Sequence, residues 1–92
     1  MKYQRTARFK KAQEELPKPI KAKVQKAYTL FQSNPHHPSL GVKKIKGRED
    51  IWEGRIDDFY RFTFEYQTDP DTGEPICLFR NIGRHDIIDH AP

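Results

Sequence analysis

Between residues 59 and 67, aromatic and polar side chains alternate along the chain. The aromatic members are Tyr60, Phe62, Phe64 and Tyr66, and the residues between them are Arg61, Thr63 and Glu65. Successive side chains of a β-strand point to opposite faces of the sheet. The segment therefore predicts a strand with one buried aromatic face and one polar face, a pattern typical of antiparallel sheets covered on one side only.

Three further segments, 42–46, 51–57 and 76–82, have the composition of short strands and are separated by turn residues. Asp57-Asp58 supplies a tight turn and residues 68–73 supply a longer one. Sequential strands then pair as a meander. The chain thus predicts a three- or four-stranded antiparallel sheet, with residues 1–5 as a possible edge strand.

Two amphipathic helices are predicted before this sheet. The first runs from Thr6, a suitable N-cap, to Leu16, and the second begins after Lys18 and ends before Asn34-Pro35. Only Pro17 and Lys18 join them, so we expect a helical hairpin. The expected architecture is α+β, with an N-terminal helical hairpin on one face of the sheet. We expect the opposite face to be open and the tail after Gly83 to pack as a turn against the sheet.

The length of 92 residues favours a single domain, 1–92. No apolar run is long enough to span a bilayer, and the N-terminus lacks the apolar stretch of a signal peptide, so a cytoplasmic protein with no membrane partner is expected. Cys77 is the only cysteine. It cannot form an internal disulfide, and its place among apolar strand residues predicts a buried, unreactive thiol.

Charge is distributed unevenly along the chain. Residues 1–46 carry ten Lys and two Arg against two Glu, a net charge of +10, whereas residues 47–92 carry five Arg against eleven acidic residues, a net charge of −6. The basic half is typical of a surface that meets a polyanion. A solvated helix face is the alternative interpretation of the same lysines.

Alternation places Arg61, Glu53 and Arg55 on the open face of the sheet. Lysines of the preceding strand join them according to the register: either Lys44 and Lys46, or Lys43. Cations, one carboxylate and a nearby imidazole suit the binding and cleavage of a phosphodiester, with attack by a ribose 2′-hydroxyl and no metal ion. The alternative is that the three residues form ordinary cross-strand ion pairs.

The tail carries His85 beside Asp86, with His90 four residues later. Histidine exchanges a proton near neutral pH, and Asp86 could orient it; a solvated C-terminus is the alternative. His36-His37 has no third ligand at a known spacing. We therefore expect no metal site and no cofactor.

Taken together, these pieces resemble the RelE/ParE superfamily of toxins from type II toxin-antitoxin systems, across nearly the whole chain. The most specific segments are Asn34-Pro-x-x-Pro38-Ser-Leu, Trp52-Glu-x-Arg55-Ile, Tyr60-Arg61 and Gly83-x-His85-Asp86. The resemblance implies a small RelE-like toxin that cleaves mRNA, generally in the ribosomal A site, and whose partner is a small acidic antitoxin.

Residue roles also follow from the resemblance. Arg61 matches the strand arginine that contacts the scissile phosphate, and His85 falls where members carry a catalytic Arg or His. Glu53 lies on the strand where some members place a base. The predicted RNA-binding residues are Lys43, Lys44, Lys46, Arg55 and Arg84.

Two departures from the RelE pattern bear on this assignment. Positions 52 and 54 are Trp and Gly where that pattern has catalytic lysines, and no tyrosine follows His85 in the tail. Asp86 or His90 could substitute for the missing tyrosine. A ParE-like inhibitor of DNA gyrase and a catalytically degenerate homologue that only binds are the alternative functions, because one fold serves all three.

Overall fold

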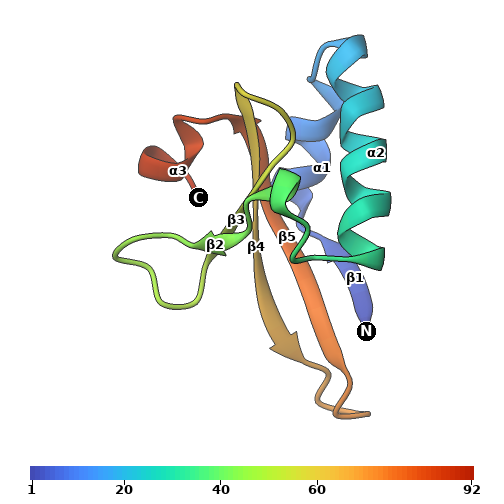
Figure 1. Ribbon diagram of the computed structural model, residues 1–92. Coiled ribbons are helices and arrows are strands. Elements are labelled where there is room, and N and C mark those ends of the chain that lie inside the picture. The colour runs from blue at the N-terminus through green and yellow to red at the C-terminus, as the bar shows by residue number, and fades with distance from the viewer.

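The computed structural model describes residues 1–92, and five strands form one mixed sheet in the order β1-β5-β4-β3-β2 (Figure 1). The elements in chain order are β1 (Lys2–Arg5), α1 (Ala7–Glu14), α2 (Lys18–Ser33), the 3-10 turn η1 (Pro38–Leu40), β2 (Lys43–Lys44), β3 (Trp52–Arg55), β4 (Tyr60–Thr68), β5 (Pro75–Arg84) and α3 (Ile87–His90). Helices α1 and α2 lie on one side of the sheet and α3 lies on the other (Figure 1). None of the helices has the length and apolarity needed to cross a bilayer.

The α+β architecture is confirmed, but the prediction of a three- or four-stranded antiparallel sheet is wrong. β1 is a fifth strand, and it pairs with β5 in the parallel direction. Tyr3 of β1 stacks on Phe79 at a centroid distance of 6.3 Å, and the amide of Thr6 donates to the Phe79 carbonyl. The direction of this pairing depends on how the chain returns to the sheet after two helices, which local alternation does not encode.

Both helices begin at their predicted signals and α2 also ends at its own, whereas α1 ends at Glu14, two residues before the predicted Leu16. The Thr6 hydroxyl accepts a hydrogen bond from the amide of Phe9 at 3.0 Å, so Thr6 is the N-cap of α1. Pro19 lies in the first turn of α2, where a missing N–H has no cost, and α2 stops before Asn34-Pro35. These local signals set the limits of the two helices, which lie on the same side of the sheet (Figure 1).

The core between the helices and the sheet is aromatic. Phe31 of α2 meets Phe62 and Phe64 of β4 edge-to-face at 5.6 and 5.0 Å, and Phe64 is fully buried. Gly54 of β3 lies directly opposite Phe62, and a Cβ at position 54 would come within 2.2 Å of the Phe62 ring. Only glycine therefore fits there.

The other face of the sheet is not fully open, which corrects the prediction. The tail packs against the sheet as expected, but with the short helix α3 in place of the predicted turn. It also covers Thr63, whose hydroxyl donates to the Pro92 oxygen at 2.7 Å. Thr63 is consequently 0% exposed. The register of β4 with β5 also shifts after Thr63, so that Arg80 is an extra residue in a β-bulge.

Candidate functional site

The face of the sheet that α1 and α2 do not cover is called the tail-side face. Two cross-strand rows of residues lie on it. In the first row, Arg55 of β3 pairs with Arg61 of β4, which pairs with Gly83 of β5. The second row runs through Lys43, Glu53, Thr63 and Asn81. The register thus brings Glu53, Arg55 and Arg61 to one face, as alternation predicts.

Arg61 is fixed by the turn between β3 and β4. Its Nη1 donates to the carbonyl oxygens of Asp57 at 2.6 Å and of Tyr60 at 3.0 Å, and the side chain is half-buried. The Asp57 carboxylate in turn accepts from the amides of Phe59 and Tyr60, both at 2.8 Å, and pairs with Lys23 at 3.0 Å. Arg61 therefore projects from a rigid, hydrogen-bonded hairpin.

The same contacts determine the acidity of Asp57. Partial burial acts to raise its pKa, but the amides of Phe59 and Tyr60 and the ammonium of Lys23 outweigh burial and hold the pKa below its ordinary value. Asp57 therefore stays ionised, and the turn that carries Arg61 stays closed, over the whole neutral range.

The alternative interpretation of Glu53, Arg55 and Arg61 as cross-strand ion pairs does not match the structure. None of the three takes part in any of its five ion-pair contacts. Instead, two arginines lie directly opposite each other, an arrangement in which like charges destabilise the sheet. This pair of cations lacks a carboxylate partner.

A groove of about 370 Å³ lies beside these rows, between the β2–β3 loop and α3. Its lining includes Lys43, Lys46, Arg48, Glu53, Ile88 and Asp89. Sequence reasoning missed Arg48; the signal was a second basic residue in the exposed loop, two positions after Lys46. The groove gathers four positive charges, counting Lys44 along its edge, against two carboxylates.

The tail residues lie at the end of the β4–β5 ladder. The amide of His85 donates to the Phe59 carbonyl at 2.8 Å, which continues the pairing beyond Arg84. Alternation from Gly83 then puts His85 on the tail-side face with Arg61, and its side chain is exposed. Asp86 is the N-cap residue of α3 and makes no hydrogen bond to His85, while His90 is exposed at the end of α3.

Among the predicted RNA-binding residues, Arg84 belongs to the opposite face, and Lys44, although it also lines the groove, packs on Trp52. The Lys44 ammonium lies 5.4 Å from the centre of the Trp52 ring, and the Arg84 guanidinium lies 5.5 Å from the ring centre of Phe59 and 5.8 Å from that of Tyr60. Lys44 is next to Lys43 in β2 and Arg84 is next to Gly83 in β5, and successive side chains of a strand point to opposite faces. Their cation–π contacts give both a structural role.

The same alternation explains the departure from the RelE pattern at positions 52 and 54. Trp52 pairs with Phe64 and Gly54 pairs with Phe62, so both positions face the helices. The positions of β3 that face the groove side are 53 and 55, which carry Glu and Arg. A lysine at position 54 would clash with the Phe62 ring.

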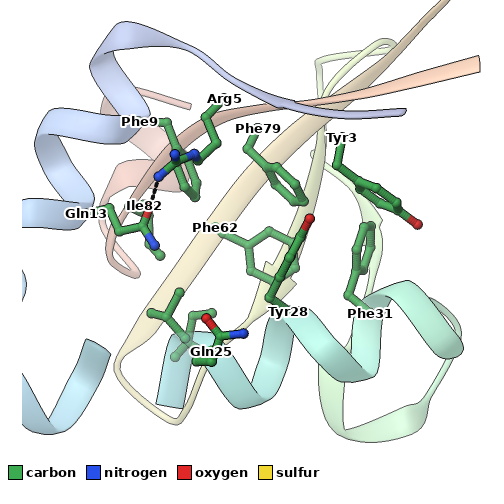
Figure 2. Close-up of a pocket in the computed structure, with 12 residues that line it drawn as sticks. Tyr3, Arg5, Phe9, Gln13, Gln25, Tyr28, Phe31, Phe62, Phe79 and Ile82 are labelled. Atoms are coloured by element: carbon green, nitrogen blue, oxygen red, sulfur yellow. Dashed lines mark hydrogen bonds between the residues drawn. The ribbon is translucent and has the colours of Figure 1, made fainter. Parts of the chain in front are cut away.

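A second concavity lies on the helix side of the sheet, between α2 on one side and β1 and α1 on the other (Figure 2). This aromatic cleft has a volume of about 380 Å³, and nine of its twelve lining residues are hydrophobic. Tyr3, Tyr28 and Phe79 lie around it, and burial raises the pKa of Tyr3. Arg5 donates to Gln13 at 2.9 Å at its margin (Figure 2). Helices α1 and α2 therefore leave part of the helix side of the sheet uncovered.

No protein-family model and no curated protein matches the chain, but solved structures do. One is a YoeB/ParE toxin from Agrobacterium tumefaciens, 17% identical, with a TM-score of 0.71 over 92% of this chain and 99% of that chain. YafQ of E. coli is 13% identical, with a TM-score of 0.71 over 94% of each chain. A RelB–RelE antitoxin–toxin complex from Methanococcus jannaschii is 20% identical, with a TM-score of 0.65 over 100% of this chain and 99% of that chain.

Proposed function

Because the chain has the fold of the YoeB/ParE, YafQ and RelE toxins, we propose that it is the toxin of a type II toxin-antitoxin system. Its activity is that of a metal-independent endoribonuclease, which cleaves mRNA on the ribosome at the A site and so inhibits translation. The proposal places the active site on the tail-side face of the sheet.

The observation that carries this proposal is the pair Arg55 and Arg61, directly opposite each other beside a basic groove and without a carboxylate partner. Like charges in this position cost stability in the free protein. A phosphodiester bound between the two guanidinium groups would remove that cost and gain charge-assisted hydrogen bonds. Because the Asp57 turn already holds Arg61, little reorganisation would be needed on binding.

The residues on this face can supply each step of RNA cleavage. Glu53 takes the proton from the ribose 2′-hydroxyl as its oxygen attacks phosphorus, and Arg61 and Arg55 stabilise the charge that develops on the phosphoryl oxygens. His85 protonates the 5′-oxygen as the P–O5′ bond breaks. The products are a 2′,3′-cyclic phosphate and a 5′-hydroxyl, so atoms and protons balance without a cofactor.

The partner in this proposal is a small acidic antitoxin. RelE and YafQ have been crystallised with RelB and DinJ respectively. In this chain, α1 and α2 contribute residues to the aromatic cleft and also carry exposed lysines, of which only Lys23 is in an ion pair. An amphipathic acidic helix could bury its apolar face in the cleft and place carboxylates near the lysines.

Mapping of mRNA ends by primer extension after brief induction tests the activity. We expect cuts within codons for the wild type, and a loss of about 100-fold or more in cleavage for Arg61→Ala and for His85→Ala. Lys26→Ala, which removes an exposed cation of α2, should cleave normally. Unchanged cleavage in the Arg61 and His85 variants would refute the site, and inhibition of gyrase supercoiling without any mRNA cuts would replace the nuclease by a ParE-like function.

A further inference from the structure

Three side-chain donors of the tail-side face converge on oxygens of two consecutive residues of the tail. Thr63 Oγ1 donates to the Pro92 oxygen at 2.7 Å, Arg80 Nε donates to the same oxygen at 3.3 Å, and Asn81 Nδ2 donates to the Ala91 oxygen at 2.7 Å. Thr63 is 0% exposed and Asn81 is 7% exposed. The donors thus form a buried, preorganised site for acceptor oxygens, which we call the bulge pocket.

The β-bulge creates this pocket. An ordinary strand would send Arg80 and Asn81 to opposite faces. Because Arg80 is the extra residue of the bulge, both side chains reach the tail, and Asn81 lies directly opposite Thr63. Bulges are often found where a strand re-aims side chains at a functional site.

Pro92 in the pocket is buried, but the segment that leads to it is weakly anchored. Helix α3 has only four residues, too few for a helix that is stable by itself, and none of them is buried. Its apolar contact with the sheet includes Ile87 beside Gly83. Ile88 and Asp89 of the same segment line the basic groove. The tail therefore forms one wall of the groove as well as filling the pocket.

The charge balance of the pocket sets the chemistry that it accepts. Arg80 Nη1 pairs with Glu65 Oε1 at 2.5 Å, so Arg80 and Glu65 together carry no net charge and Nε is the donor directed at the tail. Such a pocket suits oxygens that accept hydrogen bonds, and the tail fills it with one oxygen of Ala91 and one of Pro92. The tail covers these donors, so its departure exposes them to water, and a ligand that replaces the tail must displace that water.

We propose that the bulge pocket binds acceptor oxygens of single-stranded RNA, and that residues 87–92 occupy it in the free protein and compete with the RNA. The identity of the ligand rests on the proposed function; the pocket and its occupant do not. Exchange of one set of oxygens for another keeps all three donors paired, so RNA entering the adjacent groove can displace the tail at little cost.

Fluorescence anisotropy with 2′-O-methyl RNA decamers tests the proposal, because these probes lack the attacking hydroxyl and stay intact. We compare the full chain with a variant ending at Asp86 and with full-length Ile87→Ser, after circular dichroism and urea unfolding confirm that each is folded. Both changes should tighten RNA binding, by about tenfold for a tail that is docked about nine-tenths of the time.

Donor variants separate a binding pocket from a steric wall. Thr63→Val, made in the variant ending at Asp86, should cancel most of the gain, whereas Thr68→Val on the same strand should retain it. A full gain in the Thr63 variant would show that the tail only obstructs the groove, and the absence of any gain would show that it does not compete; either result overturns the proposal.

Two comparisons complete the experiment. A gain with uridine but not adenosine decamers identifies base carbonyls as the ligand oxygens, since adenine has none, whereas an equal gain with both identifies oxygens of the sugar–phosphate backbone. Cleavage assays are run separately on the ribosome. A protein that cuts no mRNA but gains affinity when the tail is removed would refute the nuclease and retain the pocket, and the reverse result would refute only the pocket.

Discussion

The two faces of the sheet are made by alternate residues of the same strands, yet they obey different constraints. On the helix side, Phe62, Phe64 and Phe79 are buried among other aromatic rings. On the tail side, Arg55 and Arg61 face each other without a carboxylate. Packing fixes the first face, whereas the second retains charges and buried polar groups that packing alone would not select.

The difference shows where the molecule gains stability and where it gives some up. A buried aromatic face contributes area and edge-to-face contacts. The tail-side face instead opposes like charges and satisfies its buried donors with a short tail. Mutations should therefore affect the free energy of unfolding on one side and mainly binding and catalysis on the other.

The largest effect on stability is expected from Phe64→Ala. Phe64 is 0% exposed and contacts five aromatic rings, so its loss removes buried area and leaves a cavity; we expect a cost of about 3 to 5 kcal/mol. Urea unfolding followed by circular dichroism measures it. Phe59→Ala, at a residue 56% exposed, serves as the control and should cost less than about 1 kcal/mol. Equal losses of unfolding free energy in the Phe64 and Phe59 variants would show that the aromatic core does not dominate the stability of the protein.

Much of the helix-side face could be predicted from the sequence because its signals are local. The alternation from Tyr60 to Tyr66, the Thr6 N-cap and the Asp57 turn each depend on neighbouring residues, and the structure contains all three. The same alternation correctly placed Glu53, Arg55 and Arg61 on one face. Resemblance to the RelE/ParE superfamily is likewise confirmed at the level of the fold.

What the sequence could not supply depends on contacts between distant segments. The parallel pairing of β1, the bulge at Arg80 and the docking of Pro92 on Thr63 each join residues that are far apart in the chain. The two-residue alternation of polar and apolar side chains does not reveal where a strand contains one extra residue. The face of Lys44 was left open for a related reason, since a shift of register by one residue reverses it. The catalytic roles of Glu53 and His85 stay predictions.

Asp57 links the two sides of the sheet, because its carboxylate pairs with Lys23 of α2 and its carbonyl accepts from Arg61 of the tail-side face. A change at Asp57 should have the next largest effect on the free energy of unfolding. Asp57→Asn keeps an acceptor for the two amides but loses the ion pair with Lys23, at a cost of about 1 kcal/mol at pH 7. The folded pKa of Asp57 lies below its unfolded value of about 3.9. Its stabilisation is therefore complete above that value and is lost as the pH falls through the folded pKa.

Urea unfolding of both proteins between pH 7 and pH 2.5 measures this dependence. The difference in unfolding free energy between wild type and Asp57→Asn should be constant above about pH 5 and shrink towards zero below about pH 4. Asp58→Asn changes an exposed neighbour in the same turn and should follow the wild type throughout. A difference that persists unchanged at the lowest pH would show that the Asp57 carboxylate charge does not hold the turn.

The smallest expected changes in the free energy of unfolding have opposite signs for arginines on the two faces. Arg55→Gln removes one of two opposed cations and should raise the free energy of unfolding by about 0.5 kcal/mol while it weakens cleavage. Arg84→Gln removes the same charge from the other face, loses its contacts with Phe59 and Tyr60, and should lower that free energy by about 0.5 to 1 kcal/mol. Urea unfolding at low salt resolves the two signs, because added salt screens the repulsion but not the ring contacts. If both substitutions destabilise the protein, Arg55 is held by contacts that offset the repulsion, and the cationic pair no longer argues for a bound phosphate.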